Sequence, residues 1–203
     1  DTPKVQWEMF NMMKFLIFVI LIISFQSWVK ADDIKDFQIE GVSIGDSLLD
    51  HMSIKNYKIF KKDQYEYVHT FATIKIKIDN LDLYEQVRGY YKIKDKNKII
   101  HAVEGTTRIS NISECIRLMS EVTDEIDKDY SHLKSEKNVF NHWVDKSNKS
   151  KVHQIDYEFN SGEAIAVQCV DWSKKMEDEN GWSDNFRVTL FDKDTLNFLR
   201  SLN

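Results

Sequence analysis

The chain has 203 residues, of which 42% are hydrophobic, with six glycines and one proline. This composition excludes a collagen-like, low-complexity or disordered chain. Asp and Glu outnumber Lys and Arg by 33 to 28, so the net charge is −5. Because binding to phosphates depends on clustered cations, this balance argues against nucleic acid as a partner.

An apolar segment near the start of the chain predicts export. Met13 and Lys14 precede an apolar run over residues 15–25. The run has the length of a signal-peptide core, whereas a spanning helix needs roughly twenty apolar residues. A small-residue cleavage pattern ends at Ala31.

We therefore expect an upstream extension over residues 1–12, a signal peptide over about 13–31 and a mature domain over 32–203. The mature domain would be periplasmic or secreted, with no stable membrane anchor. An uncleaved N-terminal anchor is the alternative.

The mature chain is predicted to begin with a short strand over 37–44 and a short helix. Asp46 occupies a position typical of a helix N-cap, with Ser47 opening the first turn. A carboxylate at the cap accepts hydrogen bonds from free backbone N–H groups and suits the helix dipole. The helix is expected to end near Ser53.

The next part of the chain predicts an antiparallel meander. Three strands are expected over 65–78, 83–93 and 99–105, because apolar and polar residues alternate there. The polar pair Asp79-Asn80 and the polar stretch 95–98 are typical of the turns that connect consecutive strands.

The period then changes to that of a helix. Apolar side chains recur every three or four residues at Ile112, Cys115, Ile116, Met119, Val122, Ile126, Tyr130 and Leu133. This spacing is typical of one long amphipathic helix. Residues 134–150 are mostly polar, and we expect a surface loop or a short helix there.

A second set of strands is predicted over 152–159, 163–172 and 186–191, with a charged loop over 173–183. Asp194 is expected to begin a last short helix. Because the strands come in hairpin-connected runs and do not alternate with helices, the sequence predicts an α+β fold. It consists of an antiparallel sheet, a meander plus a second hairpin set, packed on one long amphipathic helix, with short helices near both ends of the mature chain.

The two cysteines are predicted to meet between the long helix and the sheet. Cys115 lies in the apolar stripe of the helix, and Cys169 shares a strand phase with Ile165 and Val167. Export would permit a structural disulfide. Two buried reduced thiols are the alternative, since free cysteine is often buried.

Two sequence motifs that are typical of catalytic serines overlap near the predicted mature N-terminus. Gly41–Gly45 matches G-x-S-x-G, which requires a strained turn on a parallel sheet. Gly45–Leu48 resembles the opening block of the GDSL hydrolases, in which the serine is the nucleophile. That resemblance implies Ser47 as nucleophile, with Asp129 and His132 matching the Asp-x-x-His pair.

The rest of the sequence departs from the hydrolase pattern. No Gly-x-Asn-Asp block follows, and the predicted sheet is antiparallel. We interpret the stretch as a capped helix start and predict no catalytic residue. The six histidines show no ligand spacing, so we expect no metal and no cofactor.

Aromatic residues provide the candidate binding site. Trp143, Trp172 and Trp182 lie in or beside polar loops, and Tyr84 and Tyr90 fall in the outward phase of a strand. Exposed aromatic rings stack on sugars or organic cations and are common in interfaces. We predict a non-enzymatic module that binds a protein or a small ligand, with a GDSL-type serine esterase as the alternative.

The stretch Phe37–Asp50 and the later Cys169-Val-Asp-Trp172 resemble small exported proteins of marine alphaproteobacteria. In these, a signal peptide precedes the same Gly-Asp-Ser helix start and a Tyr-rich meander. The resemblance implies export and this fold, and it implies no activity.

Overall fold

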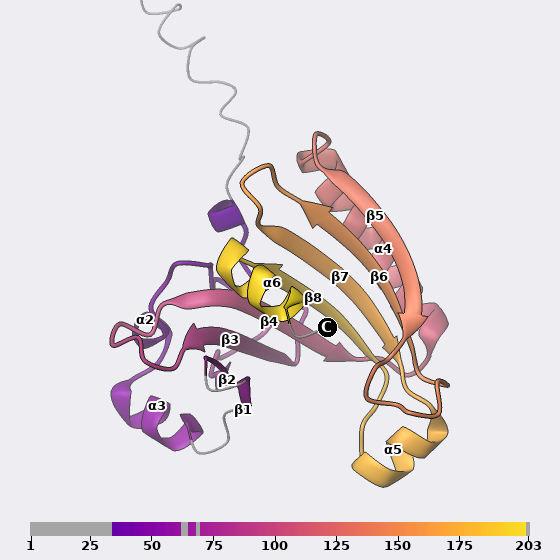
Figure 1. The fold of residues 1–203 in the computed structure, drawn as a ribbon, viewed down its shortest axis with the longest axis horizontal. Coiled ribbons are helices and arrows are strands. Elements are labelled where there is room, and N and C mark those ends of the chain that lie inside the picture. Colours follow the sequence, from indigo (N-terminus) through magenta and orange to yellow (C-terminus); the bar gives the residue numbers. More distant parts are fainter. Residues whose placement is uncertain (1–33, 62–64, 68–69, 202–203) are drawn as a thin grey trace, which may run out of the picture. The chain divides into compact units, whose positions relative to one another are not determined.

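Eight strands form one antiparallel sheet in the part of the chain that the computed structural model describes, residues 34–61, 65–67 and 70–201 (Figure 1). Their order across the sheet is β1-β2-β3-β4-β8-β7-β6-β5. Their bounds are β1 Tyr65–Tyr67, β2 Phe71–Ile76, β3 Gln86–Lys92, β4 Ile100–Arg108, β5 Lys134–Asn141, β6 Lys151–Glu158, β7 Ala164–Asp171 and β8 Asn185–Phe191. The predicted signal peptide and upstream extension lie outside the described residues.

The sheet joins the two sets of strands that the sequence predicts. β2, β3 and β4 form the meander, and β6, β7 and β8 form the predicted second set, which β5 extends. Every neighbouring pair is antiparallel. The sets meet where β4 pairs with β8, from Ala102 opposite Phe191 to Arg108 opposite Asn185. The α+β prediction with an antiparallel sheet is therefore confirmed.

The helices connect or flank these strands. They are η1 Ile34–Asp36, α2 Leu48–His51, α3 Ile54–Phe60, α4 Ile112–Asp129, α5 Lys174–Asn180 and α6 Lys193–Arg200. Within the described ranges, no helix has both the length and the apolar content that crossing a bilayer requires.

Four local predictions were wrong. Residues 37–44 form a turn with one isolated bridge, between Ile39 and Val42, and not a strand. The single strand expected over 65–78 is two strands, β1 and β2. Lys134–Asn141 is the strand β5, not a loop or a helix, and every residue in it except Asn138 is exposed. A strand exposed on both faces has no apolar alternation to reveal it. The charged segment 173–183 contains α5, in which Lys174 pairs with Asp178 and Lys175 with Glu179 one helical turn apart.

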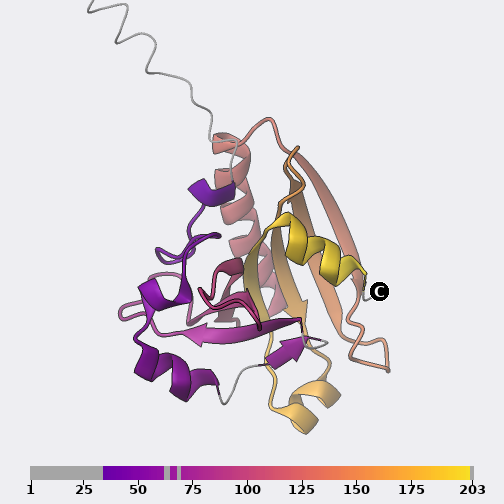
Figure 2. The same cartoon turned by 60° about the vertical axis from the view of Figure 1, so that its left-hand side comes forward.

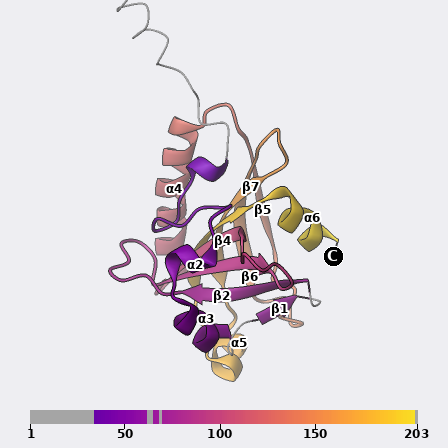
Figure 3. The ribbon, with the colours of Figure 1, turned by 90° about the vertical axis from the view of Figure 1, so that its left-hand side faces the viewer.

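α4 and α6 lie on opposite faces of the sheet, as Figure 3 shows from the side. α4 packs mainly on β7 and also contacts β8. α6 packs on the other face, where the ring of Phe198 lies 5.1 Å from that of Phe71 in β2. We call the face that α4 does not cover the open face.

The main core lies between α4 and the sheet. The buried side chains of Cys115, Met119 and Ile126 face those of Val167 and Cys169 in one hydrophobic cluster. The sulfur atoms of Cys115 and Cys169 are bonded, and their Cα atoms lie 5.8 Å apart, so the predicted pairing is confirmed. The bond ties the long helix to the middle of the sheet.

The N-terminal segment continues this core over the meander. A Cβ at Gly89 in β3 would lie 3.0 Å from the side chain of Leu48, and a Cβ at Gly105 in β4 would lie 2.8 Å from that of Ile39. The two glycines therefore let the segment pack closely against the sheet, on the same face as α4.

Candidate ligand-binding site

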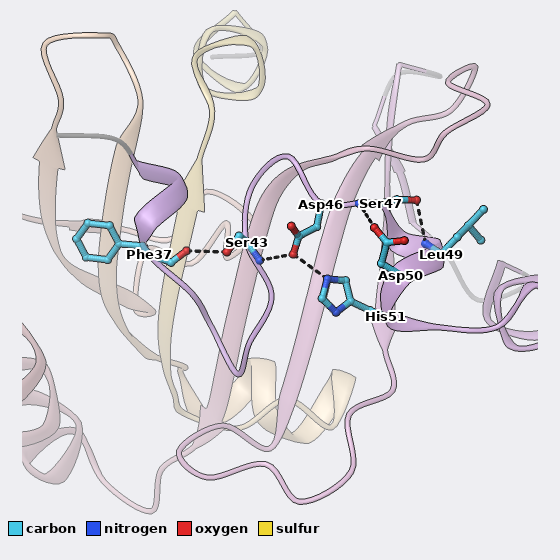
Figure 4. Close-up of polar contacts among 7 residues, drawn as sticks. All are labelled: Phe37, Ser43, Asp46, Ser47, Leu49, Asp50 and His51. Atoms are coloured by element: carbon cyan, nitrogen blue, oxygen red, sulfur yellow. Dashed lines mark hydrogen bonds and ion pairs between the residues drawn. The ribbon is translucent and has the colours of Figure 1, made fainter. Parts of the chain in front are cut away.

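The Gly-Asp-Ser stretch forms a helix start (Figure 4). Ser47 is the N-cap of α2, where its hydroxyl oxygen accepts a hydrogen bond from Leu49 N–H. The Asp50 carboxylate accepts from Ser47 N–H and completes a capping box. The interpretation as a helix start is confirmed, although the cap is Ser47 and not Asp46.

Asp46 instead holds the turn that precedes the helix. Its Oδ2 accepts from Ser43 N–H at 3.0 Å and lies 2.8 Å from His51 Nε2 (Figure 4). Ser47 Oγ donates to the carbonyl of Asn97 at 2.7 Å. The serine hydrogen is therefore directed to a backbone carbonyl and not to a histidine.

The structure does not bring Ser47 together with Asp129 and His132. Asp129 is the last residue of α4, and His132 follows in the turn to β5. Figures 1, 2 and 3 all show α2 well separated from the end of α4 that leads into β5. The geometry that an esterase triad requires is absent among these three described residues.

Three of the predicted aromatic residues do come together. The rings of Trp172 and Trp182 lie 4.5 Å apart, and His142 lies 4.3 Å from Trp172. The ring of Trp143 lies 6.2 Å from that of His142 and is 73% exposed. Burial, followed by the positive charge of Arg187, lowers the pKa of His142. This imidazole is therefore neutral at pH 7 and contributes a flat, uncharged surface.

The short helix α5 brings Trp172 and Trp182 together. Trp172 follows β7 and Trp182 precedes β8, so the helix between them returns the chain to the same end of the sheet. Gly181 ends the helix with φ +67°, a left-handed conformation that glycine adopts without strain. Trp172 N–H is held by the Asp184 carboxylate at 2.7 Å.

The loop that carries His142 is fixed to α5 by one carboxylate. Asp145 is 2% exposed, and its two oxygens accept hydrogen bonds from Ser147, Ser150 and Ser173. Ser173 is the N-cap of α5, and Figures 1 and 2 show the helix and the loop side by side. The hydrogen bonds from Ser147 and Ser150 hold the pKa of Asp145 well below its usual range. The network preorganises the aromatic cluster.

A pocket of about 490 Å³ opens beside these rings on the open face. This volume is within the usual range for small-ligand sites. Besides His142, Trp172 and Trp182, its lining includes four cations, Lys75, Arg88, Arg108 and Arg187. We call this site the Trp–Arg pocket.

The strand register places the cationic side chains next to one another. Lys75 in β2 lies opposite Arg88 in β3, and Thr106 in β4 lies opposite both Gln86 in β3 and Arg187 in β8, so these five residues span four adjacent strands. Since side chains alternate between faces, all five project from the open face. The polar row continues from Arg187 through Gln168 and Gln154 to Asn138.

Arg187 is positioned by a buried carboxylate. Glu104 is 6% exposed, and its Oε2 lies 3.7 Å from Arg187 Nη1 and accepts from the Tyr90 hydroxyl at 3.1 Å. Asn185 Oδ1 accepts from Arg187 Nη2 at 3.3 Å. These contacts from buried side chains fix the position of the Arg187 guanidinium at the pocket.

Neither Tyr84 nor Tyr90 offers the exposed ring that was predicted for ligand binding. Tyr90 lies on the open face but is 7% exposed, because its hydroxyl is engaged with Glu104. Tyr84 is half-buried, with its ring parallel to that of Phe186, 6.4 Å away. Burial raises its pKa. Tyr90 has the predicted outward phase but not an exposed ring, and Tyr84 packs beside Phe186, so the prediction that both offer exposed rings was wrong.

The arginines and His142 were not predicted as site residues from the sequence. Arg88 lies in the polar phase of its strand, but nothing in one strand shows which residue lies beside it on the next. The alternation of Asn185 and Arg187 with apolar residues was the available signal. It identifies a polar face but not the pairing of β4 with β8 that completes the site.

Among the described residues, no group of three His, Cys, Asp or Glu side chains is placed to hold a metal ion. Comparison with protein-family models, curated protein sequences and solved structures finds no match to the chain. The geometry of the Trp–Arg pocket is therefore the basis for a functional assignment.

Proposed function

We propose that residues 32–203 form an exported, non-enzymatic module that binds a small anionic ligand in the Trp–Arg pocket. The observation that carries this proposal is the convergence of two tryptophans and four cations around one pocket. Aromatic rings supply contact area at low entropic cost, and guanidinium groups supply directional hydrogen bonds to anions.

The charge of the pocket differs from that of the chain. The four lining cations face two carboxylates, the lining Glu85 and the underlying Glu104, which leaves an excess of two positive charges. The whole chain carries −5. A local positive site on an acidic protein attracts anions at short range, which favours a ligand with a few charges over a long polyanion such as a nucleic acid.

Binding can be tested with a panel of anions on different scaffolds. A nucleotide, an aromatic acid, a sugar acid and a sulfated sugar are titrated against residues 32–203 while tryptophan emission is recorded. The only tryptophans in this segment are Trp143, Trp172 and Trp182, so emission reports on the site. We expect at least one scaffold to shift emission, and the variant Trp182→Ala with Arg88→Gln to lose its binding.

The matched control is Arg117→Gln, which removes an exposed cation from α4. This variant should bind like the wild type. Unchanged emission with every anion at millimolar concentration would overturn the proposal, as would equal binding by the pocket variant.

Export is supported by the apolar run over 15–25 and by the disulfide, since such bonds persist in oxidising compartments. Residues 1–31 can be fused to an alkaline phosphatase that lacks its own leader and expressed in a bacterium. We expect enzyme activity in the periplasmic fraction, and loss of that activity when Ile20 and Leu21 are both replaced by Asp. A fusion protein that remains uncleaved and active in the membrane fraction would identify an anchor instead.

A further inference from the structure

We propose that the ligand of the Trp–Arg pocket is an acidic saccharide, one whose sugar rings carry carboxylate or sulfate groups. This inference rests on the proposed binding function and specifies its ligand. It is drawn from three properties of the pocket: how the tryptophans are arranged, which other polar groups line it, and where the aromatic surface continues.

Trp172 and Trp182 form one continuous aromatic surface and do not enclose a gap into which a ligand ring could insert. Their ring centroids are 4.5 Å apart with an angle of 49° between the planes, so the rings contact each other and leave no space for a third ring between them. A flat aromatic ligand would gain stacking on one side only. A sugar ring is suited to such a surface, because its C–H groups on one side meet the negative face of an indole.

The remaining lining favours a ligand with many hydroxyl groups. Gln86, Thr106 and Ser183 are uncharged polar residues of the pocket lining. An aromatic acid would cover these groups without pairing them, and a covered polar group without a partner costs binding free energy. A saccharide supplies a donor and an acceptor at each hydroxyl.

The cations select for an acidic group on the sugar. Arg88 and Arg108 are exposed at the pocket, and Arg187 is supported from below by Glu104. Arg108 lies 3.8 Å from the exposed Glu85, a weak pair that a ligand anion can displace. Carboxylates and sulfates both match the planar donor pattern of a guanidinium.

The aromatic surface continues out of the pocket. From Trp182 it passes through Trp172 and His142 to Trp143, with centroid separations of 4.5, 4.3 and 6.2 Å. Trp143 is 73% exposed and lies outside the pocket lining. This strip is longer than one sugar ring, so we infer that the ligand is a chain of rings and that Trp143 contacts a ring beyond the pocket.

Isothermal titration calorimetry on residues 32–203 tests the inference with five probes: galacturonate, its tetramer, a neutral galactose tetramer, a sulfated galactose tetramer and 4-hydroxybenzoate. We expect the acidic tetramers to bind at least about tenfold more tightly than the neutral one, because charged hydrogen bonds are lost in the latter. The carboxylated and sulfated probes distinguish the two sources of the anionic group.

Two variants assign the contacts. Arg88→Gln with Arg108→Gln changes only exposed side chains and should weaken the acidic tetramers by about tenfold or more. Trp143→Ala should weaken the galacturonate tetramer more than galacturonate itself. Unchanged melting temperatures establish that both variants fold, and Arg117→Gln is the control for a lost surface charge.

The failures are distinguishable. Tight binding of 4-hydroxybenzoate at the pocket, with no binding of either acidic tetramer, overturns the saccharide inference and leaves the binding function intact. An acidic tetramer whose affinity is the same in the double arginine variant overturns the assignment of the site. No binding of any probe, together with a silent anion panel, overturns both proposals.

Discussion

The hydroxyl group of Ser47 has two partners, and both belong to the backbone. Its oxygen accepts from Leu49 N–H at 3.2 Å and its hydrogen is donated to the Asn97 carbonyl at 2.7 Å. These bonds join the start of α2 to the loop that connects β3 and β4. A serine with this environment stabilises a helix and a tertiary contact, whatever sequence string it belongs to.

Replacing Ser47 by Ala should therefore destabilise the domain. We expect the free energy of unfolding to fall by about 1 kcal/mol, the usual cost of losing an N-cap side chain. Ser47→Asn should retain most of the stability, because its amide can both accept and donate. Urea denaturation measures both variants. Equal stability of Ser47→Ala and the wild type, combined with loss of an ester-hydrolysing activity, would contradict the capping role.

Asp145 is a second residue whose surroundings explain its role. Hydrogen bonds from Ser147 and Ser150 hold the pKa of this carboxyl below its unfolded value. A lowered folded-state pKa means that the stabilisation is complete above the unfolded pKa of about 3.9 and is lost as the pH falls toward the folded pKa. The ionised carboxylate thus stabilises the loop that carries His142.

Asp145→Asn tests this linkage. At pH 7 we expect the variant to unfold at lower urea concentration than the wild type, and we expect the difference to narrow as the pH falls below about 4. Glu125→Gln, which changes an exposed carboxylate on α4, is the control for general charge effects. A gap between variant and wild type that stays constant from pH 7 to pH 3 would exclude the carboxylate as its cause.

At the scale of elements, α4 is held to the sheet by apolar packing and by one covalent bond. Cys115 and Cys169 are 1% and 0% exposed, and 54 positions separate them in the sequence. Closing a loop of this length restricts the unfolded chain, which stabilises the folded state by about 4 kcal/mol in the chain-entropy description. The bond also ties α4 to β7, the strand that leads to Trp172.

Removing this bond should have a large effect. We expect the double variant Cys115→Ala with Cys169→Ala, or the wild type in excess dithiothreitol, to lose about 4 kcal/mol of unfolding free energy. Urea denaturation with and without reductant measures the loss. The double variant must be insensitive to reductant, and a wild type that is equally stable in both conditions would refute the estimate.

The elements that could be predicted from the sequence are those that bury a face against the core. The apolar period identified α4, alternation identified β3 and β4, and the second set of predicted strands contains β6, β7 and β8. Each of these elements buries at least the face that lies against the core. β5 was missed since it lies at the edge of the sheet with both faces exposed. α5 was missed because it is short and mostly charged, with Met176 as its only buried side chain among the described residues.

Two residues that line the candidate site could be named from the sequence. Trp172 and Trp182 stood out because tryptophan beside a charged loop is unusual, and they do line the pocket. Arg88, Arg108 and Arg187 come from three different strands, and only the register of β3, β4 and β8 places them together. Such register depends on tertiary packing and is not encoded in any single segment.

At the scale of the whole molecule, the two sets of strands share one sheet and one core. β4 and β8 pair over seven positions, from Ala102 to Arg108. The hydrophobic cluster is continuous across this junction, from Ile74 and Val87 in the meander to Val167 and Phe186 in the second set. Exposing either half would therefore expose the core of the other.

We accordingly expect residues 32–203 to unfold in a single cooperative transition. The tryptophans of this segment all lie in or beside the second set of strands, so their emission reports on that half, whereas circular dichroism reports on the entire sheet. Recorded on one urea titration, the two signals should give the same midpoint. If tryptophan emission changes at a distinctly different urea concentration, the halves unfold separately, and the β4–β8 pairing does not couple them.

Coincident midpoints would also mean that a destabilising substitution in the meander weakens binding at the Trp–Arg pocket through global unfolding. Every binding variant must therefore be compared with the wild type at equal folded fraction.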